Sequence, residues 1–127
     1  IFLSFNEITS QEIIGINDTY IENNLIYKIS NDSLFSGISQ RKRRNGHLVY
    51  EEKYDKGIIL ESNLYYNGKE KLISDKTIYN PKKPQTISKE IRYHLNGEVF
   101  QIKTYNNSGI KVLLEQFKNE KLIIGWK

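Results

Sequence analysis

Two histidines are the side chains in this sequence best suited to acid–base chemistry near neutral pH. His47 and His94 each lie near an Asn-Gly pair, in different parts of the chain. A general base needs a partner within hydrogen-bond reach, and no nucleophile motif accompanies either histidine. We therefore expect both to flank strands rather than to catalyse. A small nuclease that combines them with the chain's basic residues stays as an alternative function.

The densest carboxylates come next, between the two histidines. Two acids on one face can act as a glycosidase-like pair. Acids that alternate with lysines along a strand more often form a polar face with cross-strand ion pairs. We expect the second arrangement, in which Lys53 and Lys56 partner the acids Glu51, Glu52, Asp55 and Glu61.

A basic run, Arg41-Lys42-Arg43-Arg44, is the sharpest charge feature. It could grip phosphates or an acidic protein surface, or it could be a solvated arm that guards the sheet against edge pairing. The net charge of +4 permits an acidic partner without requiring nucleic acid, and we expect no nucleic-acid partner. With no cysteine and no phosphate-binding, dinucleotide or metalloprotease motif, we expect no metal, no cofactor and no enzymatic activity.

Tyrosines recur along the chain, and Tyr65 and Tyr66 are adjacent. Such rings could stack on nucleic-acid bases, but a repeat core with hydroxyls at its rim explains them better. Neighbours on a strand point to opposite faces, so one of the pair should face outward as an interface anchor. The predicted partner-binding set is therefore Arg41, Lys42, Arg43, Arg44, Glu51, Glu52, Asp55, Tyr65 and Tyr66.

The elements that must position these residues are marked by regularly spaced glycines. Gly46, Gly57 and Gly68 recur at intervals of 11 residues, and Gly97 and Gly109 are 12 apart. The Asn-Gly pairs at 45–46, 67–68 and 96–97 predict tight hairpin turns of type I′, with positive φ at both central residues. Loops without this glycine are predicted at Pro81–Pro84, which interrupts the array, and at Lys118–Lys121.

Alternating apolar residues between these turns predict half-buried strands. The chosen parity places eight residues in the core: Leu48, Tyr50, Leu60, Leu64, Ile91, Tyr93, Val112 and Leu114. Before the array we expect turns near Asn23-Asn24 and Asn31-Asp32, a strand at Leu25–Ile29 and a single helix candidate at Ser10–Ile14.

These signals predict an all-β chain of tandem antiparallel hairpins that form an extended, twisted open sheet. The 127 residues suggest one domain, with a less regular part at 1–33 and the hairpin array at 34–127. No apolar run approaches the roughly 18 residues of a spanning helix, so we expect no transmembrane segment. The richness in Ile, Lys and Asn suggests an AT-rich bacterial genome.

The array resembles a known family through short motifs in a recurring order. They are Leu34-Phe35-Ser36-Gly37-Ile38, Arg44-Asn45-Gly46-His47-Leu48, Tyr54-Asp55-Lys56-Gly57, Tyr65-Tyr66-Asn67-Gly68-Lys69 and Tyr93-His94-Leu95-Asn96-Gly97. This pattern is similar to the bacterial variant of MORN repeats and covers about residues 34–125. The unit around Tyr79 lacks the glycine, and Glu61-Ser62 stands where the family usually has another.

The resemblance implies tandem hairpins and a protein-binding role, because many such proteins are immunity or antitoxin components. We therefore expect a non-enzymatic module that binds and neutralises a cognate bacterial toxin. The alternative with the same fold is a secreted or envelope-associated protein of unknown ligand. Ile1–Phe5 is either the end of a cleaved signal segment, which implies a periplasmic or envelope location, or a first strand. An immunity protein would be cytoplasmic.

Overall fold

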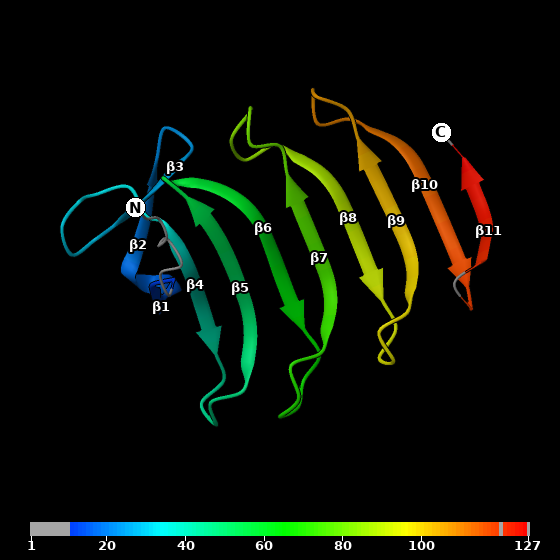
Figure 1. Cartoon of the computed structure of the whole chain (residues 1–127), viewed down its shortest axis with the longest axis horizontal. Coiled ribbons are helices and arrows are strands. Elements are labelled where there is room, and N and C mark those ends of the chain that lie inside the picture. Colours follow the sequence, from blue (N-terminus) through cyan, green and yellow to red (C-terminus); the bar gives the residue numbers. More distant parts are fainter. Residues whose placement is uncertain (1–10, 120, 127) are drawn as a thin grey trace, which may run out of the picture.

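One long sheet of mostly antiparallel strands dominates the protein (Figure 1). The computed structural model describes residues 11–119 and 121–126. In this part of the chain nine strands follow the order β1-β4-β5-β6-β7-β8-β9-β10-β11, and β2 and β3 form a separate hairpin. The strands are β1 (Ile13–Gly15), β2 (Thr19–Glu22), β3 (Leu25–Lys28), β4 (Gly37–Lys42), β5 (Leu48–Asp55), β6 (Ile58–Tyr65), β7 (Ile73–Tyr79), β8 (Ile87–Tyr93), β9 (Val99–Tyr105), β10 (Lys111–Lys118) and β11 (Lys121–Trp126). The predicted all-β open sheet is confirmed.

The N-terminal part differs from the array in its pairing. β1 joins the sheet parallel to β4, and the short 3-10 helix η1 (Ile16–Asp18) leads into the β2–β3 hairpin. The expected turn at 23–24 is present, with positive φ at both asparagines. The helix expected at Ser10–Ile14 is wrong for the described residues, because the backbone becomes a strand at Ile13. Ser10 and the segment 1–5 lie outside the described residues.

The Asn-Gly turns lie where they were predicted, but their geometry is different. Gly46 N–H donates to the Arg43 carbonyl at 2.8 Å, and Arg43 N–H donates to the His47 carbonyl at 2.8 Å. This is a three-residue loop that ends in a left-handed glycine, Gly46 at φ 91°. The 94–98 loop repeats the pattern. Asn45 instead accepts a hydrogen bond from His47 N–H through its side chain, at 3.0 Å.

Within the hairpin array, a two-residue turn with positive φ at both central positions occurs at a site that no asparagine marks. Lys56 and Gly57 have φ of 50° and 83° and join β5 to β6. The other predicted loops, around Pro81–Pro84 and between Lys118 and Lys121, separate consecutive strands as expected.

Register shifts interrupt each antiparallel pairing of the long sheet, and they decide which side chains share a face. Lys53 pairs with Glu61 while Tyr54 pairs with Ile59, so Leu60 has no opposite residue. A bulge of this kind reverses the alternation on one side of it. We call the face that carries Glu51 and Asn63 face A, and the opposite face, which carries Glu52 and Tyr54, face B.

The predicted core was wrong in part, for this reason. Leu60 and Val112 are the extra residues of two bulges and are exposed, and Leu64 is exposed on face B. Five of the predicted core residues are half-buried: Leu48, Tyr50, Ile91, Tyr93 and Leu114.

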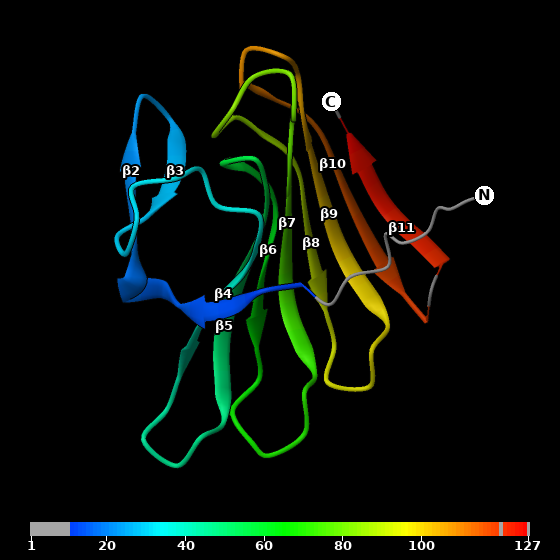
Figure 2. The same cartoon turned by 60° about the vertical axis from the view of Figure 1, so that its left-hand side comes forward.

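The observed apolar core forms where β3 and the segment after it cover face B. Ile26 and Phe35 pack against Tyr54 and Ile59, and Phe35 is fully buried. The backbones of Ile26 and Phe35 both bond to Gly57, which holds this second layer on the β5–β6 turn (Figure 2).

Within residues 11–119 and 121–126, no helix is long and apolar enough to cross a bilayer.

Candidate functional site: a polar network beside a basic end

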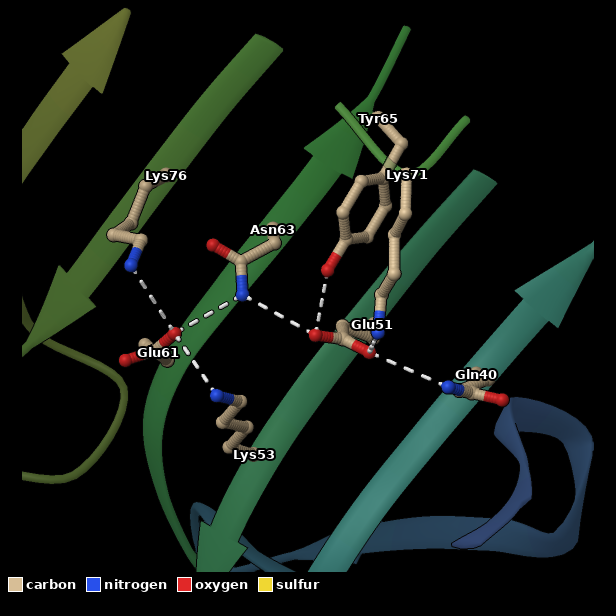
Figure 3. A network of polar contacts seen from close by, with 8 residues as sticks. All are labelled: Gln40, Glu51, Lys53, Glu61, Asn63, Tyr65, Lys71 and Lys76. Atoms are coloured by element: carbon tan, nitrogen blue, oxygen red, sulfur yellow. Dashed lines mark hydrogen bonds and ion pairs between the residues drawn. The ribbon is translucent and has the colours of Figure 1, made fainter. Parts of the chain in front are cut away.

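A row of polar side chains crosses face A of the sheet (Figure 3). Gln40, Glu51, Asn63 and Lys76 lie opposite one another on β4, β5, β6 and β7. Side chains alternate between the two faces of a strand, so residues two positions along β5 and β6 lie on the same face and join the row. The loop at 66–72 adds Lys71. The full network is Gln40, Glu51, Lys53, Glu61, Asn63, Tyr65, Lys71 and Lys76.

Glu51 is the centre of this network and is only 3% exposed. The Tyr65 hydroxyl and the Asn63 amide donate to its Oε2, at 2.6 and 3.5 Å. The Gln40 amide donates to Oε1 at 3.3 Å, and Lys71 Nζ lies 3.9 Å from the same atom. A buried carboxylate needs such partners, because an unpaired one would be costly. Both Glu51 oxygens are therefore already engaged.

Glu61 is the second carboxylate of the network and shares Asn63 with Glu51. Asn63 donates to Glu61 Oε2 at 3.0 Å, and Lys53 and Lys76 each lie 3.6 Å from that oxygen. Burial alone would raise the pKa of Glu61, but the Asn63 hydrogen bond and the two lysine charges outweigh it and lower that pKa. Three lysines thus surround two carboxylates, which leaves the network with one excess positive charge.

Two atoms stand out by their lack of partners. Asn63 Oδ1 and Ser39 Oγ are buried, and neither atom has a hydrogen-bond partner within the described part of the chain. Figure 3 shows the Asn63 oxygen on the Lys76 side of the network. The hydrogen bonds of the row are therefore complete around Glu51, whereas the Asn63 oxygen on the Lys76 side has no donor.

Face B carries a different arrangement, in which tyrosines hold carboxylates. Tyr50 donates to Glu52 Oε2 at 2.7 Å, and Tyr54 donates to Glu52 Oε1. Tyr105 likewise donates to Glu90. Burial, followed by the hydrogen bond to Glu90, raises the pKa of Tyr105 to about 12. Such hydroxyls stay protonated near neutral pH and act as hydrogen-bond donors.

The two faces of the sheet separate the adjacent carboxylates Glu51 and Glu52, which the sequence offered as a glycosidase-like pair. Glu51 and Glu52 are on opposite faces of β5, so they cannot flank one substrate bond. Glu61 does share face A with Glu51, but both already bond to lysine and asparagine side chains. The predicted pairing of Lys53 with this acidic segment is present, as the Lys53–Glu61 contact.

A hollow of about 300 Å³ opens beside the network, between the β4–β5 and β6–β7 loops. Its lining includes Lys42, His47, Lys69 and Lys71, together with Glu70. Arg43 and Arg44 are exposed in the adjoining loop. We call Lys42, Arg43, Arg44, His47, Lys69 and Lys71 the basic end. Lys71 belongs to both features, since its ammonium group reaches Glu51 and lies 5.8 Å from the centre of the Tyr65 ring.

The structure brings only some of the predicted partner-binding residues together. Lys42, Arg43 and Arg44 lie at the basic end, which Lys71 links to Glu51 and Tyr65, whereas the Arg41 guanidinium lies 5.9 Å from the centre of the Tyr50 ring. Asp55 is at the other end of β5, roughly 23 Å away at the rise of a strand, and so does not join the group.

The expectation that Tyr65 or Tyr66 faces outward as an interface anchor is wrong. Tyr65 is 6% exposed and donates to Glu51, and Tyr66 is half-buried and donates to the Tyr93 carbonyl at 2.6 Å. Tyr65 therefore acts within the network, and neither ring stands free as an anchor.

Residues that sequence analysis missed include Gln40, Asn63, Lys69 and Lys71. Strand alternation could have placed Asn63 beside Glu61, since they are two residues apart. Lys69 and Lys71 lie in a loop, and nothing in their spacing indicates that the loop returns to β4 and β5.

His47 lies in the β4–β5 loop and His94 lies in the β8–β9 loop. Both loops are at the same end of the sheet, and the β6–β7 loop lies between them (Figure 1). His94 stacks on Phe100, with ring centres 4.6 Å apart. Among the residues that the structure describes, no three His, Asp or Glu side chains cluster as metal ligands.

Comparison with known proteins adds no family to this geometry. No protein-family model matches the chain, and no curated protein matches it significantly.

Proposed function

We propose that this chain is a protein-binding module and that its partner docks on the basic end through an acidic surface. The observation that carries the proposal is the hollow between the β4–β5 and β6–β7 loops, where three lysines and His47 face a single lining acid, Glu70, within the described residues. Charge of one sign around a concave site attracts and orients a partner of opposite charge.

The polar network gives this end a fixed base. Glu51 holds Lys71, and Lys71 lines the hollow, so one charge of the docking surface is positioned by a buried carboxylate. A side chain held before binding loses less conformational freedom on binding. The exposed Arg43 and Arg44 in the adjoining loop then supply two further positive charges.

We propose a cognate bacterial toxin as the partner, and neutralisation without catalysis as the role. The support for this class is the resemblance of the hairpin motifs to bacterial MORN-type repeats, since fold alone does not identify a partner. An envelope protein of unknown ligand has the same fold and is the alternative if no toxin is bound.

The test is binding to the separately purified product of the neighbouring gene, measured by calorimetry. We expect Arg43→Glu/Lys69→Glu to weaken binding at least about tenfold, because each reversal places like charges together. The matched control is Lys82→Glu/Lys83→Glu, which makes the same charge change at the opposite end of the sheet. Equal binding by wild type and Arg43→Glu/Lys69→Glu, with the fold intact, would place the interface elsewhere.

A small basic nuclease is the rival from a different class. His47 lines the basic hollow, so degradation of RNA or DNA by the purified chain is the outcome to look for. We expect none. Degradation that is lost in the double variant His47→Ala/His94→Ala would replace the binding proposal.

A further inference from the structure

A second basic hollow lies at the other end of the sheet, between the β7–β8 loop and the β9–β10 loop. Figure 1 shows these two loops side by side at the end opposite the β4–β5 and β6–β7 loops. The hollow has a volume of about 760 Å³ and is lined by Tyr79, Asn80, Lys82, Lys83, Lys89, Tyr105 and Asn107, among others. The hollow is an open groove and not an enclosed cavity, so its lysines are accessible from solvent.

The charge of this hollow is unbalanced. Lys82, Lys83 and Lys89 line it, and no acidic residue does so in the described part of the chain. None of the three forms an ion pair with a described carboxylate, whereas Lys53, Lys71 and Lys76 on face A all do. Like charges without a counter-charge repel one another, and a bound anion would remove that cost.

The two loops are held in place before any ligand arrives. Asn80 N–H donates to the Thr86 carbonyl at 2.8 Å, and Thr86 N–H donates to the Lys83 carbonyl at 3.1 Å. Lys83 Nζ donates to the Asn107 carbonyl at 3.3 Å, which joins one loop to the other. Pro81 and Pro84 restrict the backbone on both sides of Lys82 and Lys83. The lysines are therefore presented by a restrained frame.

We propose that this hollow binds a small ligand that carries two or more phosphate groups. Each phosphate offers a charge near −2 and several acceptor oxygens, which suits ammonium donors supplemented by the amides of Asn80 and Asn107. A single carboxylate would neutralise one of the three lysines and leave the others unbalanced. The site is distinct from the proposed protein-docking surface, which lies at the opposite end.

The experiment is calorimetric titration of the whole chain with inorganic tripolyphosphate at physiological ionic strength. We expect saturable binding with one site per chain. Lys83→Ala/Lys89→Ala should weaken it at least about tenfold, because each substitution removes a charge-assisted contact. Arg43→Ala/Arg44→Ala, which removes two exposed charges at the opposite end, should leave it within about twofold of wild type.

Two further arms identify the source of the phosphate groups. A nucleoside triphosphate that binds more tightly than tripolyphosphate would show that the tyrosine-lined wall contacts a base; equal affinity would identify phosphates alone as the ligand. The proposal is overturned by a lack of saturable binding, by equal weakening in both double variants, or by a nucleoside without phosphates that binds as well. Retained protein-partner binding by Lys83→Ala/Lys89→Ala separates this outcome from the proposed function.

Discussion

The first and second halves of the sheet are built from similar strands but bury them differently. Every buried residue in the described part of the chain lies between 26 and 65, and β7 to β10 hold only half-buried and exposed residues. The cause is the second layer: the segment from β3 to Phe35 covers one face of β4 to β6, whereas no described element covers β7 to β11 (Figure 2). A hairpin array acquires a dry core only where another element packs on it.

This difference teaches how the two candidate sites are supported. The Glu51 network and the basic end lie on the half that has a core, so their geometry depends on global stability. The lysine hollow lies on the single-layered half, where hydrogen bonds within and between its two loops hold Lys82 and Lys83. Regions with few buried contacts open locally at lower free energy than the core.

The largest expected effect comes from removing a phenylalanine from each half. Phe35→Ala should lower the free energy of unfolding by about 3–5 kcal/mol, because the ring is fully buried and leaves a cavity. Phe100→Ala should cost about 1 kcal/mol, since its ring is half-buried against His94 and Arg92. Urea unfolding measures both, and equal costs would abolish the distinction between the halves.

Glycine turns provide the next comparison. At Gly57, φ is 83° and an added Cβ would lie 2.6 Å from Leu34 Cδ2 and 3.1 Å from the Ile26 carbonyl oxygen. At Gly97, φ is 91° and nothing lies within 4 Å. Gly57→Ala should therefore destabilise by more than about 2 kcal/mol and Gly97→Ala by about 1 kcal/mol, the cost of left-handed backbone alone. Thermal unfolding of the two variants checks this order, and equal losses would show that the second layer is loosely attached.

The smallest effect concerns the pH dependence of the polar network. The pKa of Glu61 is lowered in the folded chain, so its contribution to stability is present above the ordinary value of 4.5 and is lost as pH falls through the folded pKa. Because Glu61 is partly exposed, we expect Glu61→Gln to cost less than about 1 kcal/mol near pH 7 and nothing at low pH. Asp75→Asn, which breaks the exposed Asp75–Arg92 pair, is the control. A cost for Glu61→Gln that stays unchanged as the pH falls through the folded pKa of Glu61 would show that packing, and not charge, is responsible.

Local chemistry made the strand order and the turn positions predictable. Glycine adopts left-handed backbone at a lower cost than other residues, so Gly46, Gly57 and Gly97 marked hairpins correctly even though the turn type at two of them differed. The short apolar stretch Ile13–Ile14 carries no such marker, and its strand depends on pairing with β4, which no local signal indicates.

Thus the sequence by itself determined that the chain is a series of antiparallel hairpins and where each reverses, because turns are decided by a few adjacent residues. The tertiary structure decided which side chains are buried, because bulges such as the one at Leu60 reverse the alternation and because the layer that covers face B comes from a segment distant in sequence. It also decided that Glu51 and Glu52 lie on different faces, and that Lys42 and the β6–β7 loop lysines Lys69 and Lys71 line a common hollow. Those outcomes depend on contacts between residues that are remote in the chain, to which local patterns are insensitive.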